Sequence, residues 1–150
     1  MLNPLRKYYT VAITSYVLFL NGDDVLLSRR AQTGYRDGEY GLPSGHVDEK
    51  EYALTAAIRE AKEEVGVDIK QDELKFVHVM HRHCGDHERI EMFFMTKKWN
   101  GELVNAEPNK CDEIRWVNIN DLPENTIPYI KMAIDNYRQG IEYSEFLETE

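Results

Sequence analysis

This 150-residue sequence is poor in cysteine, in basic residues and in long apolar runs. Only Cys84 and Cys111 occur, too few for a disulfide framework, so we expect reduced thiols and a cytoplasmic location. The 18 lysines and arginines are outnumbered by 27 aspartates and glutamates, and the formal net charge is -9. Because an acidic surface repels polyanions, we expect no nucleic acid polymer as a partner. We expect no membrane contact either, because no segment is long and apolar enough to cross a bilayer.

A basic start followed by an apolar run superficially resembles a signal peptide. Arg6 and Lys7 precede the apolar residues 11–20. A Thr-Ser pair interrupts this run, however, and turn-forming residues close it where a signal peptide would have a small-residue cleavage site. We therefore interpret it as a strand. The length and the hydrophobic content of 42% predict one domain over residues 1–150.

The spacing of apolar residues predicts a mixed α/β domain. Residues 8–20 and 25–28 are rich in strand-forming residues, and Asn21-Gly22 between them predicts a hairpin turn. The glycine-rich stretch 34–45 predicts a shaped loop. Residues 48–65 have apolar positions at helical spacing, and Gly66 stops the helix. Further elements are predicted as strands over 74–82, 89–99 and 113–119 and a helix over 129–137, with the tail from 141 left open. This order suggests a mixed sheet with helices packed on it.

One face of the first predicted helix is acidic. Glu60, Glu63 and Glu64 stand at i, i+3 and i+4, a spacing that places their side chains on one face. A solvated acidic face explains this equally well, because such like-charge pairs cost only roughly 0.2 to 0.5 kcal/mol each. Two features favour a ligand site. Ala53 and Ala56 leave space on the preceding turns of that face, and the glycine-rich loop stands just before the helix. Hard divalent cations such as Mg²⁺ prefer the oxygen ligands that these segments offer.

Residues 45–67, GHVDEKEYALTAAIREAKEEVGV, resemble the signature box of the Nudix hydrolases. The fixed positions of that box are all matched, at Gly45, Glu51, Arg59, Glu60, Glu63, Glu64 and Gly66. The resemblance implies an α/β/α sandwich with a mixed β-sheet, in which the catalytic helix follows a glycine-rich loop.

The resemblance also implies roles for the box residues. Divalent cations, Mg²⁺ or Mn²⁺ as its substitute, are held by three carboxylates and one backbone carbonyl, at Glu60, Glu63, Glu64 and Ser44. The residue matching Arg59 orients the glutamates through hydrogen bonds. We expect the remaining fixed positions to be structural, and Glu51 in particular because it falls opposite Glu60 on a regular helix. These structural positions are Gly45, Glu51 and Gly66.

A second group of candidates lies outside the box. The loop before the last strands offers Glu107 and Glu113 as a general base. Its spacing resembles the nucleotide-sanitising branch of the family at Glu107, which we favour as a base or an extra metal ligand. By the same resemblance, Arg30 contacts the nucleotide and Asn125 reads the base. An ordinary loop carboxylate or strand-end arginine explains these residues about equally well. The predicted catalytic set is Arg59, Glu60, Glu63, Glu64 and Glu107.

A group of histidines and one cysteine, at His81, His83, Cys84 and His87, raises the question of a zinc site. The spacing lacks a second pair of ligands, and neighbouring residues on a strand point to opposite faces. We therefore expect these residues to line the cleft or to serve ordinary strand and turn roles.

The resemblance predicts hydrolysis of a diphosphate linkage in a small nucleotide. Because residues typical of the ADP-ribose, dinucleoside polyphosphate and NADH groups are missing downstream of the box, we favour conversion of a nucleoside triphosphate to a monophosphate and pyrophosphate. ADP-ribose, nucleotide-sugar and dinucleotide substrates stay open. So do a non-catalytic nucleotide-binding module, an isoprenoid-type isomerase with a catalytic cysteine, and a homodimer.

Overall fold

Eight strands and two α-helices form in the computed structural model, which describes residues 1–149. In chain order they are β1 (Ala12–Asn21), β2 (Asp24–Arg30), β3 (Tyr40–Gly41), β4 (Ser44–His46), α1 (Ala53–Val65), the 3-10 turn η1 (Gln71–Glu73), β5 (Lys75–His83), β6 (Glu88–Thr96), β7 (Cys111–Asn118), α2 (Pro128–Gln139) and β8 (Tyr143–Leu147). The hairpin predicted at Asn21-Gly22 is confirmed, because Leu20 pairs with Val25 across that turn.

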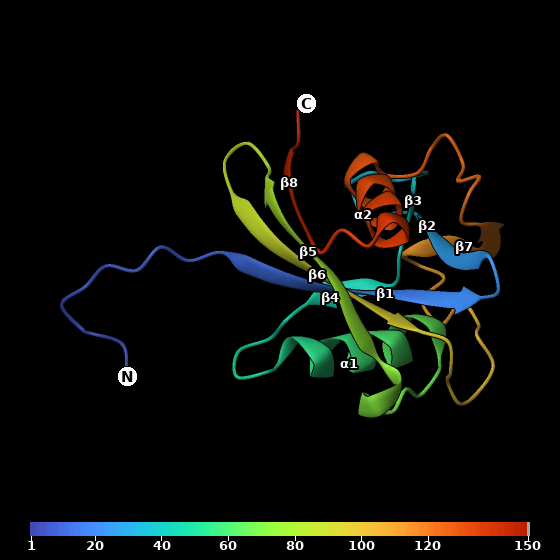
Figure 1. Cartoon of the computed structure of the whole chain (residues 1–150), viewed down its shortest axis with the longest axis horizontal. Helices are drawn as coiled ribbons and strands as arrows, with labels where there is room; N and C mark the ends of the chain where they lie inside the picture. The colour runs from blue at the N-terminus through green and yellow to red at the C-terminus, as the bar shows by residue number, and fades with distance from the viewer. Residues whose placement is uncertain (150) are drawn as a thin grey trace.

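The strands form a mixed sheet in the order β3-β2-β1-β6-β5-β8, with β4 paired to β1 and β7 paired to β2. The β1–β6 and β5–β8 pairs are parallel, whereas β1–β4, β2–β7 and β5–β6 are antiparallel. Helix α1 lies on one side of the strands and α2 on the other (Figure 1). The α/β/α sandwich with a mixed sheet is therefore confirmed.

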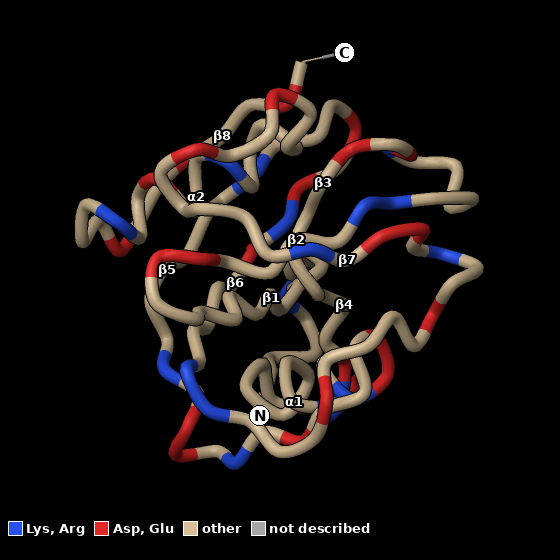
Figure 2. Tube along the Cα trace, turned by 90° about the vertical axis from the view of Figure 1, so that its right-hand side faces the viewer, with Lys and Arg blue, Asp and Glu red and all other residues tan. Residues whose placement is uncertain are grey.

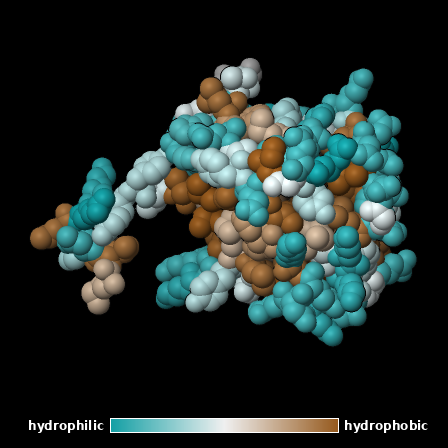
Figure 3. Space-filling view, viewed as in Figure 1, coloured by the Kyte–Doolittle hydropathy of each residue, from teal (hydrophilic) through white to brown (hydrophobic). Residues whose placement is uncertain are grey.

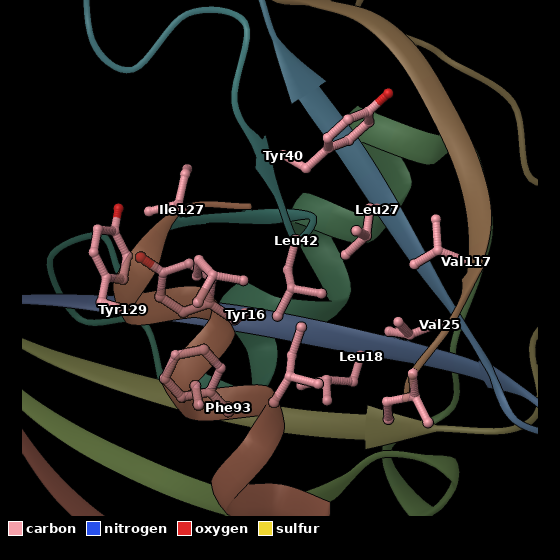
Figure 4. Close-up of a cluster of buried hydrophobic side chains, with 14 of the residues drawn as sticks. Tyr16, Leu18, Val25, Leu27, Tyr40, Leu42, Phe93, Val117, Ile127 and Tyr129 are labelled. Carbon is pink, nitrogen blue, oxygen red and sulfur yellow. The ribbon is translucent and has the colours of Figure 1, made fainter. Parts of the chain in front are cut away.

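Each helix covers its own hydrophobic cluster. On the α2 side, Tyr16 stacks on Phe93 with ring centroids 4.6 Å apart, and Leu18 and Leu42 complete the centre of the cluster (Figure 4). On the α1 side, the helix contributes the stripe of small apolar residues that its spacing predicts. These residues, Ala57, Ala61 and Val65, are fully buried against the sheet.

Two predictions about element boundaries are wrong, and the tail that the sequence left open forms a strand. Helix α1 begins at Ala53, because residues 48–51 form a turn in which Lys50 has a φ of 65°, a value that a right-handed helix excludes. The loop predicted over 34–45 contains the short strands β3 and β4. The open tail forms β8, a strand at the edge of the sheet beside β5.

The alanines at the start of α1 also have a different role from the one expected. Ala56 is fully buried, and the backbone carbonyl of Ala53 accepts a 2.7 Å hydrogen bond from the hydroxyl of Ser15 in β1. The small side chains therefore let the helix approach the sheet closely. They do not leave space for a ligand.

The N-terminal segment before β1 extends away from the body of the molecule (Figure 3). Its apolar residues Met1, Leu2 and Leu5 are exposed. Within residues 1–149, neither helix has the length and hydrophobicity needed to span a membrane.

Candidate active site

The strand that precedes α1 is held in place by β1. Ser44 and Gly45 pair with Tyr16 and Ser15, and the carbonyl of Pro43 accepts a 2.9 Å hydrogen bond from the N–H of Val17. This attachment points the N–H of Ser44 at the helix, where it donates a 2.9 Å hydrogen bond to Oε2 of Glu64. The loop and the acidic helix thus meet at one fixed point.

Arg59 connects the turn before α1 with the glutamates on the helix. Its Nε and Nη2 donate hydrogen bonds of 2.9 and 3.0 Å to the two oxygens of Glu51, and its Nη1 donates a 2.7 Å hydrogen bond to Glu60. A further hydrogen bond of 3.0 Å reaches the carbonyl of His46. The pKa of Arg59 is raised, chiefly by the hydrogen bonds to Glu51. Glu51 precedes the helix, so the expectation that it lies opposite Glu60 on a regular helix is wrong. It binds the arginine that orients Glu60.

The three box glutamates share one side of α1, but different partners hold them. Arg59 holds Glu60 and lies 3.4 Å from an oxygen of Glu63, whereas the N–H of Ser44 holds Glu64. Glu63 is the most exposed of the three, with half of its side chain accessible. The three carboxylates are therefore held at different points along one side of the helix.

A loop that passes the end of α1 brings Glu107 to the same place. The last carbonyls of a helix have no partner within the helix. Here the N–H of Val104 donates to the carbonyl of Val65 at 3.1 Å, and the N–H of Ala106 donates to the carbonyl of Glu64 at 3.0 Å. Glu107 follows directly, which is why a residue more than forty positions after the helix joins its carboxylates.

Burial and like charge act together on these carboxyl groups. Burial raises the pKa of Glu64 from 4.5 to about 8; Glu60 and Glu107 also raise it, while the N–H of Ser44 and the charge of Arg30 lower it. Burial also raises the pKa of Glu60, against the hydrogen bond from Arg59. The ionised forms of these two carboxyl groups are therefore disfavoured unless a further positive charge is present. An all-oxygen donor set of this kind fits a hard divalent cation such as Mg²⁺.

Two connected hollows adjoin the glutamates. A small cavity of about 130 Å³ is lined by Glu64, Glu107, Arg30 and Lys110, among others. A wider cleft of about 920 Å³ shares Ser44 and Glu64 with it and includes Glu60. Acidic and basic residues are interspersed along the whole trace (Figure 2), but the cleft gathers cationic side chains. They are Arg30, Arg36, Arg82, Arg89 and Lys110.

A buried ion network forms the far wall of the cleft, and the sequence analysis missed it. Arg82 is 3% exposed, donates a 2.9 Å hydrogen bond from Nε to Glu91, and lies 3.9 Å above the ring centroid of Tyr129. Glu148 binds both Arg82 and Arg36. The available signal was an arginine two residues after Met80 in β5, at a position that alternation places on the buried face, but its partners come from β6 and from the end of the chain.

The other predicted residues separate into those at the cleft and those away from it. Arg30 lines both hollows, with its guanidinium held by the carbonyl of Tyr35 at 2.8 Å. Asn125 lines neither hollow and donates a 2.9 Å hydrogen bond to the carbonyl of Gly38. Glu113 also lies outside both, where it accepts a 2.8 Å hydrogen bond from the hydroxyl of Tyr40. Base reading by Asn125 stays a prediction.

The histidines and the cysteine around the turn between β5 and β6 also differ in whether they line the cleft. Cys84 and His87, at the turn between β5 and β6, line the wide cleft as expected. His81 and His83 point elsewhere, toward Glu88 on β6. Both cysteines are free thiols.

Comparison with known proteins decides the family. The profile of the NUDIX domain matches residues 10–136. The chain belongs to the Nudix hydrolase family. The NAD-capped RNA hydrolase NudC of Pseudomonas putida is 26% identical to it over 119 residues, which are 79% of this chain and 41% of that protein. The putative 8-oxo-dGTP diphosphatase 3 of Mycobacterium tuberculosis is 32% identical over 101 residues, 67% of this chain and 46% of that protein. The chain thus spans less than half the length of these curated relatives.

Solved Nudix structures share the fold. The MutT NUDIX hydrolase from Burkholderia pseudomallei has a TM-score of 0.77 and 22% identity, over 85% of this chain and 98% of that one. The MutT protein from Methanosarcina mazei Go1 has a TM-score of 0.74 and 19% identity, over 86% and 94% of the two chains.

Proposed function

We propose that this Nudix protein is a Mg²⁺-dependent pyrophosphohydrolase that converts a nucleoside triphosphate to a monophosphate and pyrophosphate. The observation that carries the proposal is the position of Glu107, which joins Glu60 and Glu64 beside a cavity that also presents Arg30 and Lys110. Carboxylates for a cation and cationic groups for phosphate oxygens line one space, and Nζ of Lys110 lies 3.4 Å from Glu107. The 8-oxo-dGTP diphosphatase among the relatives acts on a substrate of this class by its name.

Mg²⁺ or Mn²⁺ would be held by carboxylate oxygens and one backbone carbonyl, from Glu60, Glu63, Glu64, Glu107 and Ser44. When bound, the cation neutralises phosphate charge and lowers the pKa of water. Arg59 keeps Glu60 in position through its bond to Glu51. Arg30 and Lys110 bind phosphate oxygens that the cation does not reach.

Glu107 is the proposed general base. Water adds to a phosphorus of the anhydride, the bond from that phosphorus to the bridging oxygen breaks, and pyrophosphate leaves. Glu107 accepts the proton that the attacking water gives up. Glu113 is less suited to this role, because its carboxylate is held by Tyr40 and lies 3.3 Å from Arg29.

The cysteines argue against an isomerase. Burial raises the pKa of both Cys84 and Cys111, which disfavours the thiolate form that a nucleophilic cysteine needs. We expect Cys84→Ser and Cys111→Ser to retain activity. Complete loss with either variant would favour the isomerase.

The substrate is tested with a panel and product identification. The panel holds nucleoside triphosphates including 8-oxo-dGTP, ADP-ribose, nucleotide sugars, NADH and NAD-capped RNA, since NudC relatives are named for the last of these. We expect a triphosphate to give the highest kcat/KM, no turnover in excess chelator, and restoration by Mg²⁺ or Mn²⁺. Preference for a dinucleotide or a capped RNA would replace the proposed substrate. Turnover that persists in chelator would overturn the metal dependence, and no turnover of any compound would favour a binding module.

A further inference from the structure

The turn between β5 and β6 carries a second cluster of ligand-type side chains, outside the glutamate site. His83 pairs directly with Glu88 across the two antiparallel strands, and His81 lies two residues back on the same face of β5. Nε2 of His81 is 2.7 Å from Oε2 of Glu88, and Nε2 of His83 is 3.6 Å from the same oxygen. One ligand atom from each residue lies within 4.8 Å of the other two.

These distances suit a small cation bound at the centre of the three atoms. Tetrahedral zinc sites have bonds of about 2.0 to 2.2 Å, which places their ligand atoms about 3.3 to 3.6 Å from one another. The observed 3.6 Å lies at the upper end of this range, and the observed 2.7 Å lies below it. Binding of all three atoms to one ion would require the contact between His81 and Glu88 to lengthen, by rotation of side chains that are partly exposed.

The donor types select the class of metal. Two imidazoles and one carboxylate favour Zn²⁺, Cu²⁺, Ni²⁺ or Co²⁺, whereas Mg²⁺ prefers oxygen alone. The side chains of His81, His83 and Glu88 are 34%, 53% and 23% exposed, which leaves a path for the ion and room for water as a further ligand.

A hydrogen bond between His81 and Glu88 does not explain the whole arrangement. Within residues 1–149, the imidazole of His83 makes no hydrogen bond, yet it turns toward the same carboxylate, with its ring centroid 5.1 Å from that of His81. We propose that His81, His83 and Glu88 form a binding site for a divalent transition-metal ion, separate from the glutamate site. His83 and Glu88 flank the turn that carries Cys84 and His87, so a bound ion would cross-link the two strands that support this wall of the cleft.

The test is calorimetric titration with Zn²⁺ in saturating Mg²⁺, and optical titration with Co²⁺, whose absorption reports tetrahedral coordination. It uses the whole protein carrying Glu63→Gln, a substitution that weakens binding at the glutamate site. To this protein are added His83→Ala, Glu88→Gln or, as a matched control, His87→Ala, which removes an exposed histidine of the same turn that pairs with Asp86.

We expect one binding event with Zn²⁺ and a tetrahedral Co²⁺ spectrum in the parent protein and in the His87→Ala control. The Zn²⁺ binding event and the tetrahedral Co²⁺ spectrum should both be lost with His83→Ala and with Glu88→Gln. Circular dichroism should show that all variants are folded. Equal Zn²⁺ binding in all four proteins would overturn the site. So would Zn²⁺ binding that is seen in the protein with Glu63 intact and is absent from all four Glu63→Gln proteins, because the ion would then occupy the glutamate site.

Discussion

The carboxyl group of Glu60 lies directly against Gly45, so that a Cβ atom on Gly45 would come within 2.0 Å of Cδ of Glu60. No side chain tolerates such an approach, and the neighbour that must yield is a proposed metal ligand. A side chain at this position would therefore displace the end of the Glu60 side chain, whereas the backbone conformation of Gly45 is not in the left-handed region.

Replacement of this glycine tests the packing. We expect Gly45→Ala to displace Glu60 and to lower kcat about 100-fold, the scale of loss from a misplacement of about 1 Å. The fold should persist. Gly41→Ala is the control, because its Cβ would lie 3.4 Å from Ile127, an ordinary contact. Steady-state rates at several Mg²⁺ concentrations provide the measurement, and a native rate for Gly45→Ala would contradict the expected displacement.

Substitution of Glu63 tests the acidic face itself. Glu63→Gln removes one charge with little change in size or helix propensity. Without metal we expect the variant to be as stable as the parent or slightly more stable, because like charges are diluted. With Mg²⁺ the parent should gain more stability than the variant, since stabilisation by a ligand follows its affinity. The rate should fall by orders of magnitude.

Thermal melts of both proteins with and without Mg²⁺, paired with rate assays, provide these measurements. Glu124→Gln, at an exposed glutamate outside both hollows, is the matched control and should behave like the parent. If Glu63→Gln shows the parent's Mg²⁺-induced shift and an unchanged rate, the acidic face is merely solvated.

The two loop glutamates should differ in their effect on turnover. Glu107 lies at the cavity with Glu64, whereas Glu113 is bonded to Tyr40. We expect Glu107→Gln to lower kcat strongly with little change in KM, and Glu113→Gln to have a small effect. Single-turnover rates separate these outcomes. Near-native rates for both variants would move the general base onto α1.

The pKa of Glu64 predicts how stability depends on pH. Its pKa rises from 4.5 to about 8 on folding, so between these values the folded chain holds a proton that the unfolded chain has lost. Stability from this group is fully present below pH 4.5 and is lost as pH rises toward 8, in the absence of metal. Glu64→Gln should remove this slope in melts recorded across the window, and an unchanged slope would contradict the assignment.

Metal binding should show the opposite trend. Mg²⁺ must displace the proton of Glu64, so its apparent affinity should rise by up to about tenfold per pH unit below the pKa of the carboxyl group. Activity should consequently be greatest at alkaline pH. Calorimetric Mg²⁺ titrations at several pH values measure this dependence, and an affinity independent of pH would exclude Glu64 as a ligand.

Local features were predictable from the sequence. Two examples are the hairpin at Asn21-Gly22 and the end of α1 at Gly66, which has a φ of 76°. Both follow from the backbone preferences of the residues themselves and need no contact with distant segments. The start of α1 was not predictable from periodicity, because Lys50 breaks the helical pattern through its backbone and not through its polarity. Boundaries of this kind depend on contacts that spacing does not reveal.

Features built from distant segments were not predictable. Arg82 is buried only because Glu91 and Glu148 neutralise it, and these residues belong to three different parts of the chain. Strand β8 forms by pairing with the edge strand β5, so its own residues did not reveal its secondary structure. Within the site, the resemblance to the Nudix box identified the residues of α1 in advance. The ion network at the far wall of the cleft could be recognised only from the assembled sheet.

The parallel pairing of β1 with β6 has a consequence for folding. Residues 12–19 bond to residues 89–96, and helix α1 lies between them in the chain. As the protein is synthesised, the apolar stripe of this helix is complete long before the sheet that it covers. A helix of this length has little stability without such packing, and pairings between distant segments form slowly. A peptide of residues 45–67 would therefore carry every fixed residue of the Nudix box and still have no site.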